Sequence, residues 1–130
     1  MILVIDPRVP GEESGLCPDF VRILRGRFND EDVELVSARI AKMISDRPSV
    51  SVLVVYVRES DELLRAVLEE AFRRSVPVIG FSVNVRDNHV GFKGENGEWL
   101  PRQLFKAAIE IPFESEILEY LVEDVLQKKA

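Results

Sequence analysis

The sequence predicts an α/β domain with a mostly parallel sheet of four or five strands and helices on both faces. Residues 50–57 and 76–83 are apolar at nearly every position, which is typical of parallel strands that are covered on both sides. The segment between them has apolar residues at helical spacing. Because such a strand–helix–strand unit forms a right-handed crossover, we expect a small doubly wound sheet.

Length and composition fit one soluble domain. The chain has 130 residues, 46% of them hydrophobic and 31% charged, so we treat residues 1–130 as one unit with a single core. The net charge of −6 disfavours nucleic acid as a partner, since nonspecific binding of that kind needs a clustered basic surface. The 12 arginines against five lysines, with six Asn and Gln together, make a thermophile-like composition.

The sequence favours a cytoplasmic location. No apolar run reaches the roughly 20 residues needed to span a membrane, so no membrane association is expected. The N-terminal MILVID has no basic leader or small-residue cleavage site. Cys17 is the one cysteine, which excludes an internal disulfide and suits a reducing compartment. We interpret it as an ordinary thiol, although a helix start beside it is a setting that lowers a thiol pKa.

The first half of the chain alternates strands and helices. Residues 2–5 are expected to form a buried strand that ends at Asp6, and Asp19 or Pro18 is expected to begin a helix with Phe20 and Leu24 inward. Residues 31–46 allow two interpretations: one helix that begins with an Asn or Asp cap and acidic residues in its first turn, or a strand over 33–37 followed by a short helix over 38–46. We prefer the single helix for its cap and its longer periodicity. Which interpretation holds determines whether the sheet has four main strands or five.

The second half is expected to hold two further helices and an insertion. The helix after residue 60 should bury its apolar stripe, which we expect to include Phe72, and a final helix capped by Ser115 should bury a stripe that includes Ile117. Residues 107–111 are expected to form the last strand. Between these elements, residues 84–100 contain the turn signal Gly-Glu-Asn-Gly, and we expect a hairpin there, which we call the flap.

The candidate site lies at the carboxyl edge of the sheet, where open parallel sheets bind ligands. Carboxylates there could hold Mg²⁺, a histidine could act as a general base, and an arginine could clamp a phosphate. The competing interpretation is that these residues cap a helix or are solvated, and it is favoured about three to one because loops are ordinarily polar. No metal-ligand spacing is present, so no metal or other cofactor is assigned. The ligand-binding candidates are Asp6, Arg58, Glu59, Ser60, Ser82, Arg86, Asp87 and His89.

Two aromatic residues of the flap are candidates for contact with a partner. Phe92 and Trp99 could each stack on a ligand or on a second chain. Equally, each could anchor the hairpin to the core, since aromatic side chains are suited to both settings. The arginine groups elsewhere are interpreted as solvated helix faces with ion pairs.

Two segments resemble response-regulator receiver domains, a family with a flavodoxin-like fold. Residues 108–127, AIEIPFESEILEYLVEDVLQ, resemble the last strand and helix of a receiver. Residues 76–83, VPVIGFSV, resemble its fourth strand and place Ser82 near the switch hydroxyl of the family. Asp6 lies where receivers keep an acidic metal-binding pair.

The chain departs from receivers where their chemistry lies. Tyr56, Val57 and Arg58 occupy the place of the phospho-accepting aspartate, and Ile111 replaces the lysine that normally precedes the final proline. The resemblance therefore implies a degenerate, receiver-like module that is not phosphorylated. The flavodoxin-like or Rossmann-like fold that it implies agrees with the doubly wound sheet expected from the pattern.

Residues 31–81 also resemble TIR-like domains, in which an amphipathic helix, a buried strand and a second helix lead to VPVIG. Val67 stands near the position of the catalytic glutamate of that family, and Ala66 near its aromatic neighbour. The resemblance implies the fold without NAD cleavage. From both likenesses we expect a non-catalytic regulatory or protein-interaction module that forms a homodimer through the flap or the last helix. The alternative is an enzyme or sensor for a small phosphorylated or nucleotide ligand at the carboxyl edge.

Overall fold

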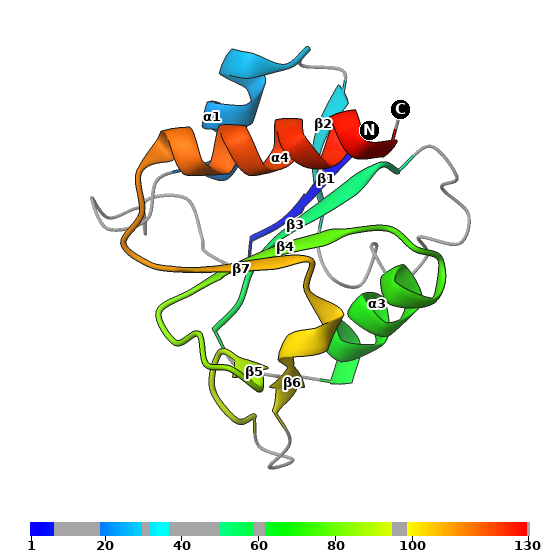
Figure 1. Ribbon diagram of the computed structural model, residues 1–130, viewed down its shortest axis with the longest axis vertical. Coiled ribbons are helices and arrows are strands. Elements are labelled where there is room, and N and C mark those ends of the chain that lie inside the picture. The colour runs from blue at the N-terminus through cyan, green and yellow to red at the C-terminus, as the bar shows by residue number, and fades with distance from the viewer. Residues whose placement is uncertain (7–18, 30–31, 37–49, 59–61, 95–98, 130) are drawn as a thin grey trace.

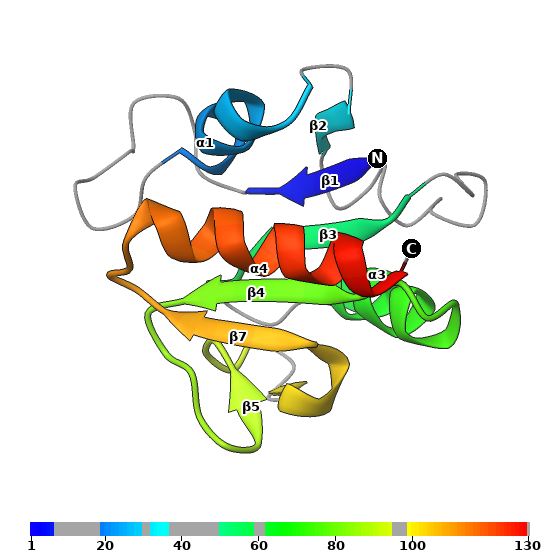
Figure 2. The same cartoon turned by 45° about the horizontal axis from the view of Figure 1, so that its top comes forward.

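Five strands form one parallel sheet in the order β2-β1-β3-β4-β7 (Figures 1 and 2). The computed structural model describes residues 1–6, 19–29, 32–36, 50–58, 62–94 and 99–129. The strands of this sheet are β1 (Ile2–Ile5), β2 (Val33–Val36), β3 (Val52–Tyr56), β4 (Val78–Ser82) and β7 (Ala107–Glu110). The helices are α1 (Phe20–Arg27), α3 (Glu62–Arg73), α4 (Ser115–Lys129) and the short 3₁₀ helix η3 (Arg102–Leu104).

The strand order is that of a doubly wound sheet. From β1 the chain adds β2 on one side, and it then crosses to the other side, where β3, β4 and β7 follow in order. All four neighbouring pairs run parallel, so the change of direction lies between β1 and β3. The predicted α/β fold class is confirmed, with five strands in the main sheet.

The preferred helix over residues 31–46 is wrong at its start. Val33–Val36 form β2, an edge strand that pairs with β1 from Ile2↔Val33 to Ile5↔Val36. The ladder beside a buried strand outweighs the acidic helix-start signal, because local propensity is weaker than tertiary pairing. The short helix expected over 38–46 in the other interpretation lies outside the described residues.

One face of the sheet is covered by α1 and α4, which pack against each other (Figure 2). Asp19 caps α1 as predicted, since its Oδ1 accepts a hydrogen bond from the Arg22 amide at 3.2 Å. At the centre of this face, the ring of Phe20 lies 5.0 Å from that of Phe81, centroid to centroid. At the rim, the Arg27 guanidinium donates to both Glu123 carboxylate oxygens at 2.9 and 3.0 Å, and this hydrogen bonding raises the pKa of Arg27.

The opposite face is covered by α3, by η3 and by an antiparallel pair formed by β5 (His89–Val90) and β6 (Leu100–Pro101). The flap predicted over 84–100 thus contains a small hairpin. Beside it, the ring of Phe105 lies directly on the backbone of Gly80 in β4. A Cβ atom at position 80 would stand 2.5 Å from the Phe105 ring, so this part of the cover fits only a glycine beneath it.

Two apolar residues expected in the core lie at the surface. Phe72 is 59% exposed and Ile117 is 38% exposed. Other residues of each stripe form the buried face, namely Leu64, Val67, Leu68 and Ala71 in α3 and Leu118, Val122 and Val125 in α4. Phe72 also belongs to the end of α3, where the Ser75 amide donates to the Phe72 carbonyl and the Val76 amide to the Ala71 carbonyl. These bonds form a Schellman motif with Ser75 at φ 59°.

Candidate functional site

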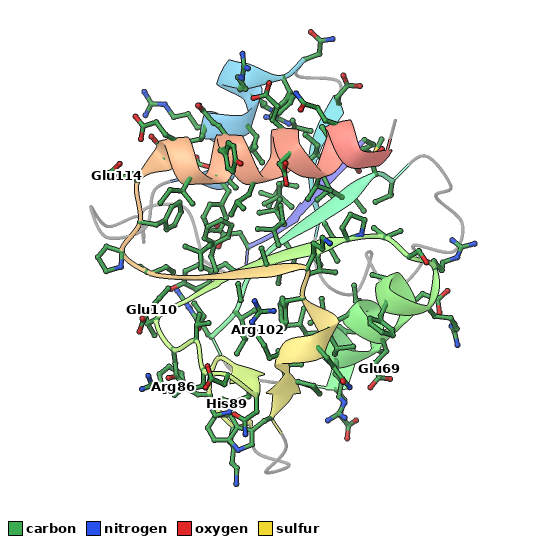
Figure 3. The ribbon with its side chains drawn as sticks, viewed as in Figure 1. Glu69, Arg86, His89, Arg102, Glu110 and Glu114 are labelled. Atoms are coloured by element: carbon green, nitrogen blue, oxygen red, sulfur yellow. The ribbon has the colours of Figure 1, made fainter. Side chains whose placement is uncertain are left out.

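The carboxyl ends of the strands meet at one edge, as expected. The register aligns Ile5 with Val55 and Ser82 with Glu110, so the residues that follow each strand leave the sheet on the same side. Figure 3 shows Glu110 at this edge, with Arg86 and His89 on the flap beyond it. The candidate site therefore consists of the loop after β3 and the flap after β4.

Asn84 holds the start of the flap. It is 8% exposed, its backbone carbonyl accepts a hydrogen bond from the Gly91 amide at 2.7 Å, and its side-chain Nδ2 donates to the Gly91 carbonyl at 2.7 Å. The Asn84 amide in turn donates to Ser82 Oγ at 3.2 Å. Asn84 thus satisfies both backbone polar groups of Gly91, one through its own carbonyl and one through its buried side chain, and this fixes the path of the chain.

Gly91 docks the flap on the end of β3. Its φ of +81° belongs to the left-handed region that favours glycine. A Cβ atom there would lie 2.6 Å from Val57 Cγ1 and 3.1 Å from the Arg58 carbonyl oxygen. The next residue, Phe92, donates its amide to that same Arg58 carbonyl at 2.9 Å. The flap is thus bonded to its own base and to the neighbouring loop.

The tip of this hairpin carries three of the predicted site residues, namely Arg86, Asp87 and His89. Val85 and Val90 form an antiparallel bridge, and the Arg86 amide donates to the His89 carbonyl at 2.9 Å. A second bond, from the Arg102 amide to the Asn88 carbonyl at 3.0 Å, ties the tip to η3. The backbone of the tip is therefore held from two directions, and Arg86 and Asp87 are exposed at its surface.

Trp99 stacks on His89 within the flap. Their ring centroids lie 3.8 Å apart at an interplanar angle of 33°, and Lys93 Nζ lies 5.5 Å from the indole centroid. His89 Nδ1 also lies 2.7 Å from the Asn88 side-chain oxygen. The ring contact between Trp99 and His89 joins the two sides of the hairpin. Of the two aromatic candidates, Trp99 is half-buried in the flap, while Phe92 is 45% exposed.

The remaining predicted residues do not all gather at the flap. Asp6 follows β1, which is separated from β4 by β3, so it lies roughly 10 Å from Ser82 by strand spacing. The Ser82 side chain is fully buried. The Arg58 guanidinium lies over the Tyr56 ring, 5.6 Å from its centroid. Glu59 and Ser60 lie outside the described residues.

Two residues that build this site were not singled out from the sequence. Asn84 and Gly91 both lie within the segment 84–100 that is predicted as a hairpin, but the hydrogen bonds between them depend on how the chain folds back, which no local pattern predicts. The hydrogen bonds of Asn84 and Gly91 also fix the backbone that carries two exposed apolar side chains. These are Val83, which is 50% exposed, and Phe92.

Two kinds of feature are absent from the part of the chain that the structure describes. There, no three His, Cys, Asp or Glu side chains lie close enough together to hold a metal ion. In the same part of the chain, no helix has the length and apolar character needed to cross a membrane. The described side chains of the candidate site are chiefly aromatic, arginine and amide groups.

The chain is similar to a solved structure at low sequence identity. No protein-family model and no curated protein sequence matches this chain. A solved structure, "The Vibrio vulnificus NanR protein complexed with ManNAc-6P", is similar at 12% identity with a TM-score of 0.45. The match covers 98% of this chain and 48% of that one, so this chain spans about half the length of the NanR chain.

Proposed function

We propose that this protein is a non-catalytic protein-interaction module that associates with a second copy of itself through the flap. The observation that carries the proposal is Phe92, an aromatic side chain 45% exposed beside a backbone amide bonded to the Arg58 carbonyl. Large aromatic side chains on pre-ordered backbone are the usual anchors of protein interfaces, because little further entropy is lost when they bind. A cytoplasmic location and the degenerate receiver-like character belong to the same proposal.

The surroundings of Phe92 support an interface. Val83, 50% exposed, follows β4 at the same edge of the sheet, and Arg58 lies beside the base of the flap. An apolar centre with an arginine near it is the composition enriched in protein interfaces. The contacts of Asn84 and Gly91 hold this part of the flap in place before a partner arrives.

Sedimentation equilibrium of the wild type and of Phe92→Glu tests the proposal. The wild type should form dimers, and Phe92→Glu should weaken dimerisation by about thirtyfold or more, the effect of losing one interface anchor. The matched control is Tyr120→Glu on α4, where another aromatic side chain is 67% exposed. It should leave the dimerisation constant unchanged.

Two results would contradict the proposal. A wild type that stays monomeric at high micromolar concentration removes self-association. Dimers that are weakened by Tyr120→Glu and not by Phe92→Glu move the interface to the last helix. Circular dichroism of both variants should match the wild type, because surface substitutions of this kind change stability little.

A second candidate function is the binding of a small phosphorylated or nucleotide ligand at the same edge. Two exposed arginines favour it: Arg58, braced by the Tyr56 ring, and Arg86 on the flap tip. Arginine pairs with phosphate through two parallel hydrogen bonds. Thermal shift with inorganic phosphate and with AMP tests this candidate. A specific ligand raises the unfolding midpoint, and Arg58→Gln should abolish that rise. No shift in the wild type would remove this candidate.

A further inference from the structure

A groove lies at the opposite edge of the sheet, across the amino ends of β4 and β7. Its volume is about 640 Å³, within the range of small-molecule sites. Figure 1 shows α3 and η3 on the same side of the sheet, beside the starts of these two strands. The residues that matter here are Phe72, Val76, Pro77, Leu104, Phe105 and Lys106.

The floor of the groove belongs to the ordered core. Phe105 and Leu104 are 4% and 8% exposed, and the Phe105 ring is fixed against Gly80. Phe72 differs, because 59% of it is exposed although it lines the same hollow. A molecule with an apolar body that covers Phe72 would remove a large aromatic surface from water, which favours binding.

The charges near the groove are positive. Lys106 lines it and is exposed, and no described residue forms an ion pair with its ammonium group. At the end of α3, just before the lining residue Ser75, both Arg73 and Arg74 pair with the single carboxylate of Glu70. Two guanidinium groups therefore lie at this end of α3, in a chain whose net charge is −6. The negative end of the α3 dipole is offset by these arginines.

We propose that this groove binds a small amphipathic carboxylate. The apolar body lies on Phe72, Leu104 and Phe105, and the carboxylate pairs with Lys106. An apolar wall beside one unpaired cation suits a carboxylate better than the other two ligand classes. Lys106 would repel an amine, and a neutral chain would leave its ammonium group without a partner. The site is independent of the flap and of self-association.

Titration calorimetry with decanoate, below its aggregation concentration, tests the proposal, with decanol and decylamine as probes of equal chain length. Decanoate should bind with one-to-one stoichiometry and more tightly than either control. Lys106→Gln should weaken decanoate binding by about threefold to fivefold, as expected for a partly solvated ion pair, and leave decanol unchanged. Phe72→Ala should weaken both decanoate and decanol by about tenfold.

The variants are suited to the test because both positions are exposed, so the fold should persist. Arg58→Gln, at the other edge of the sheet, serves as the matched control and should bind decanoate as the wild type does. Absence of decanoate binding would overturn the proposal. So would equal affinity for decylamine, or an affinity for decanoate that neither Lys106→Gln nor Phe72→Ala changes.

Discussion

The two faces of the sheet are covered in different ways. On one face, α1 and α4 bury regular apolar stripes around Phe20 and Leu118. On the other, one regular helix, α3, shares the cover with η3 and the flap, which depend on single contacts at Gly80, Asn84 and Gly91. The difference teaches that a helical cover is held by many interchangeable apolar contacts, whereas an irregular cover is held by a few contacts of fixed geometry.

Phe20→Ala should have the largest effect, because it empties the centre of the helical face. The Phe20 ring is fully buried and lies within 5.0 to 6.2 Å of the rings of Phe81, Phe113 and Tyr56. Truncation should lower the free energy of unfolding by about 3–5 kcal/mol, measured by urea denaturation. Tyr120→Ala, at a position that is 67% exposed, is the control and should change it by less than about 0.5 kcal/mol. A loss equal to that of the control would contradict the packing described for Phe20.

Gly91→Ala should have the second largest effect on stability, because it adds a side-chain atom where the flap packs closely on the end of β3. The added Cβ meets Val57 at 2.6 Å, and φ is +81°, so we expect a loss of about 2–4 kcal/mol in stability. Amide exchange should accelerate in the flap more than in β1. Gly26→Ala is a matched control, because a Cβ there meets nothing within 4 Å and alanine favours the helix by roughly 0.5–1 kcal/mol. Uniform acceleration of exchange in both regions would show that the flap does not open separately.

Asn84→Ala removes the side-chain bond that closes the base of the flap. The Gly91 carbonyl then loses its partner at a buried position, which should lower the free energy of unfolding by about 1–3 kcal/mol. Asn88→Ala, an exposed amide in the same hairpin, is the control and should stay within about 0.5 kcal/mol of the wild type. Equal effects from the two substitutions would contradict a special role for Asn84.

Ser75→Gly should have the smallest effect and the opposite sign. Ser75 adopts φ 59° at the end of α3, a conformation that glycine reaches without strain. Relief of that strain, reduced by the greater freedom of glycine in the unfolded chain, should stabilise the protein by roughly 0.5–1 kcal/mol. Thermal unfolding measures the gain. Ser75→Ala, which keeps a Cβ in the same conformation, should show none, and an equal gain from alanine would refute the explanation.

The regular parts of the fold could be predicted from the sequence better than the irregular cover. The apolar runs that became β1, β3, β4 and β7 were recognised, and so were the helices that became α1, α3 and α4, because periodicity records burial directly. β2 was misjudged, since its four residues carry a helix-start signal, and only the neighbouring β1 makes them a strand.

The candidate sites were less accessible to prediction. The carboxyl edge followed from strand order alone, and the structure places Arg86, Asp87 and His89 in one turn there. That Trp99 stacks on His89 while Phe92 stays exposed depends on how the flap folds back. The groove was missed altogether, because its lining comes from segments that sequence spacing does not bring together.

The contact between Gly80 and Phe105 has a consequence for related sequences. Any side chain at position 80 would enter the space that the Phe105 ring occupies, so the two positions are not free to change one at a time. Among homologues we expect them to covary: a glycine paired with an aromatic ring, or a larger residue paired with a small one. That pairing would identify chains whose β4 is covered by a ring from the segment before β7, even where little other sequence similarity remains.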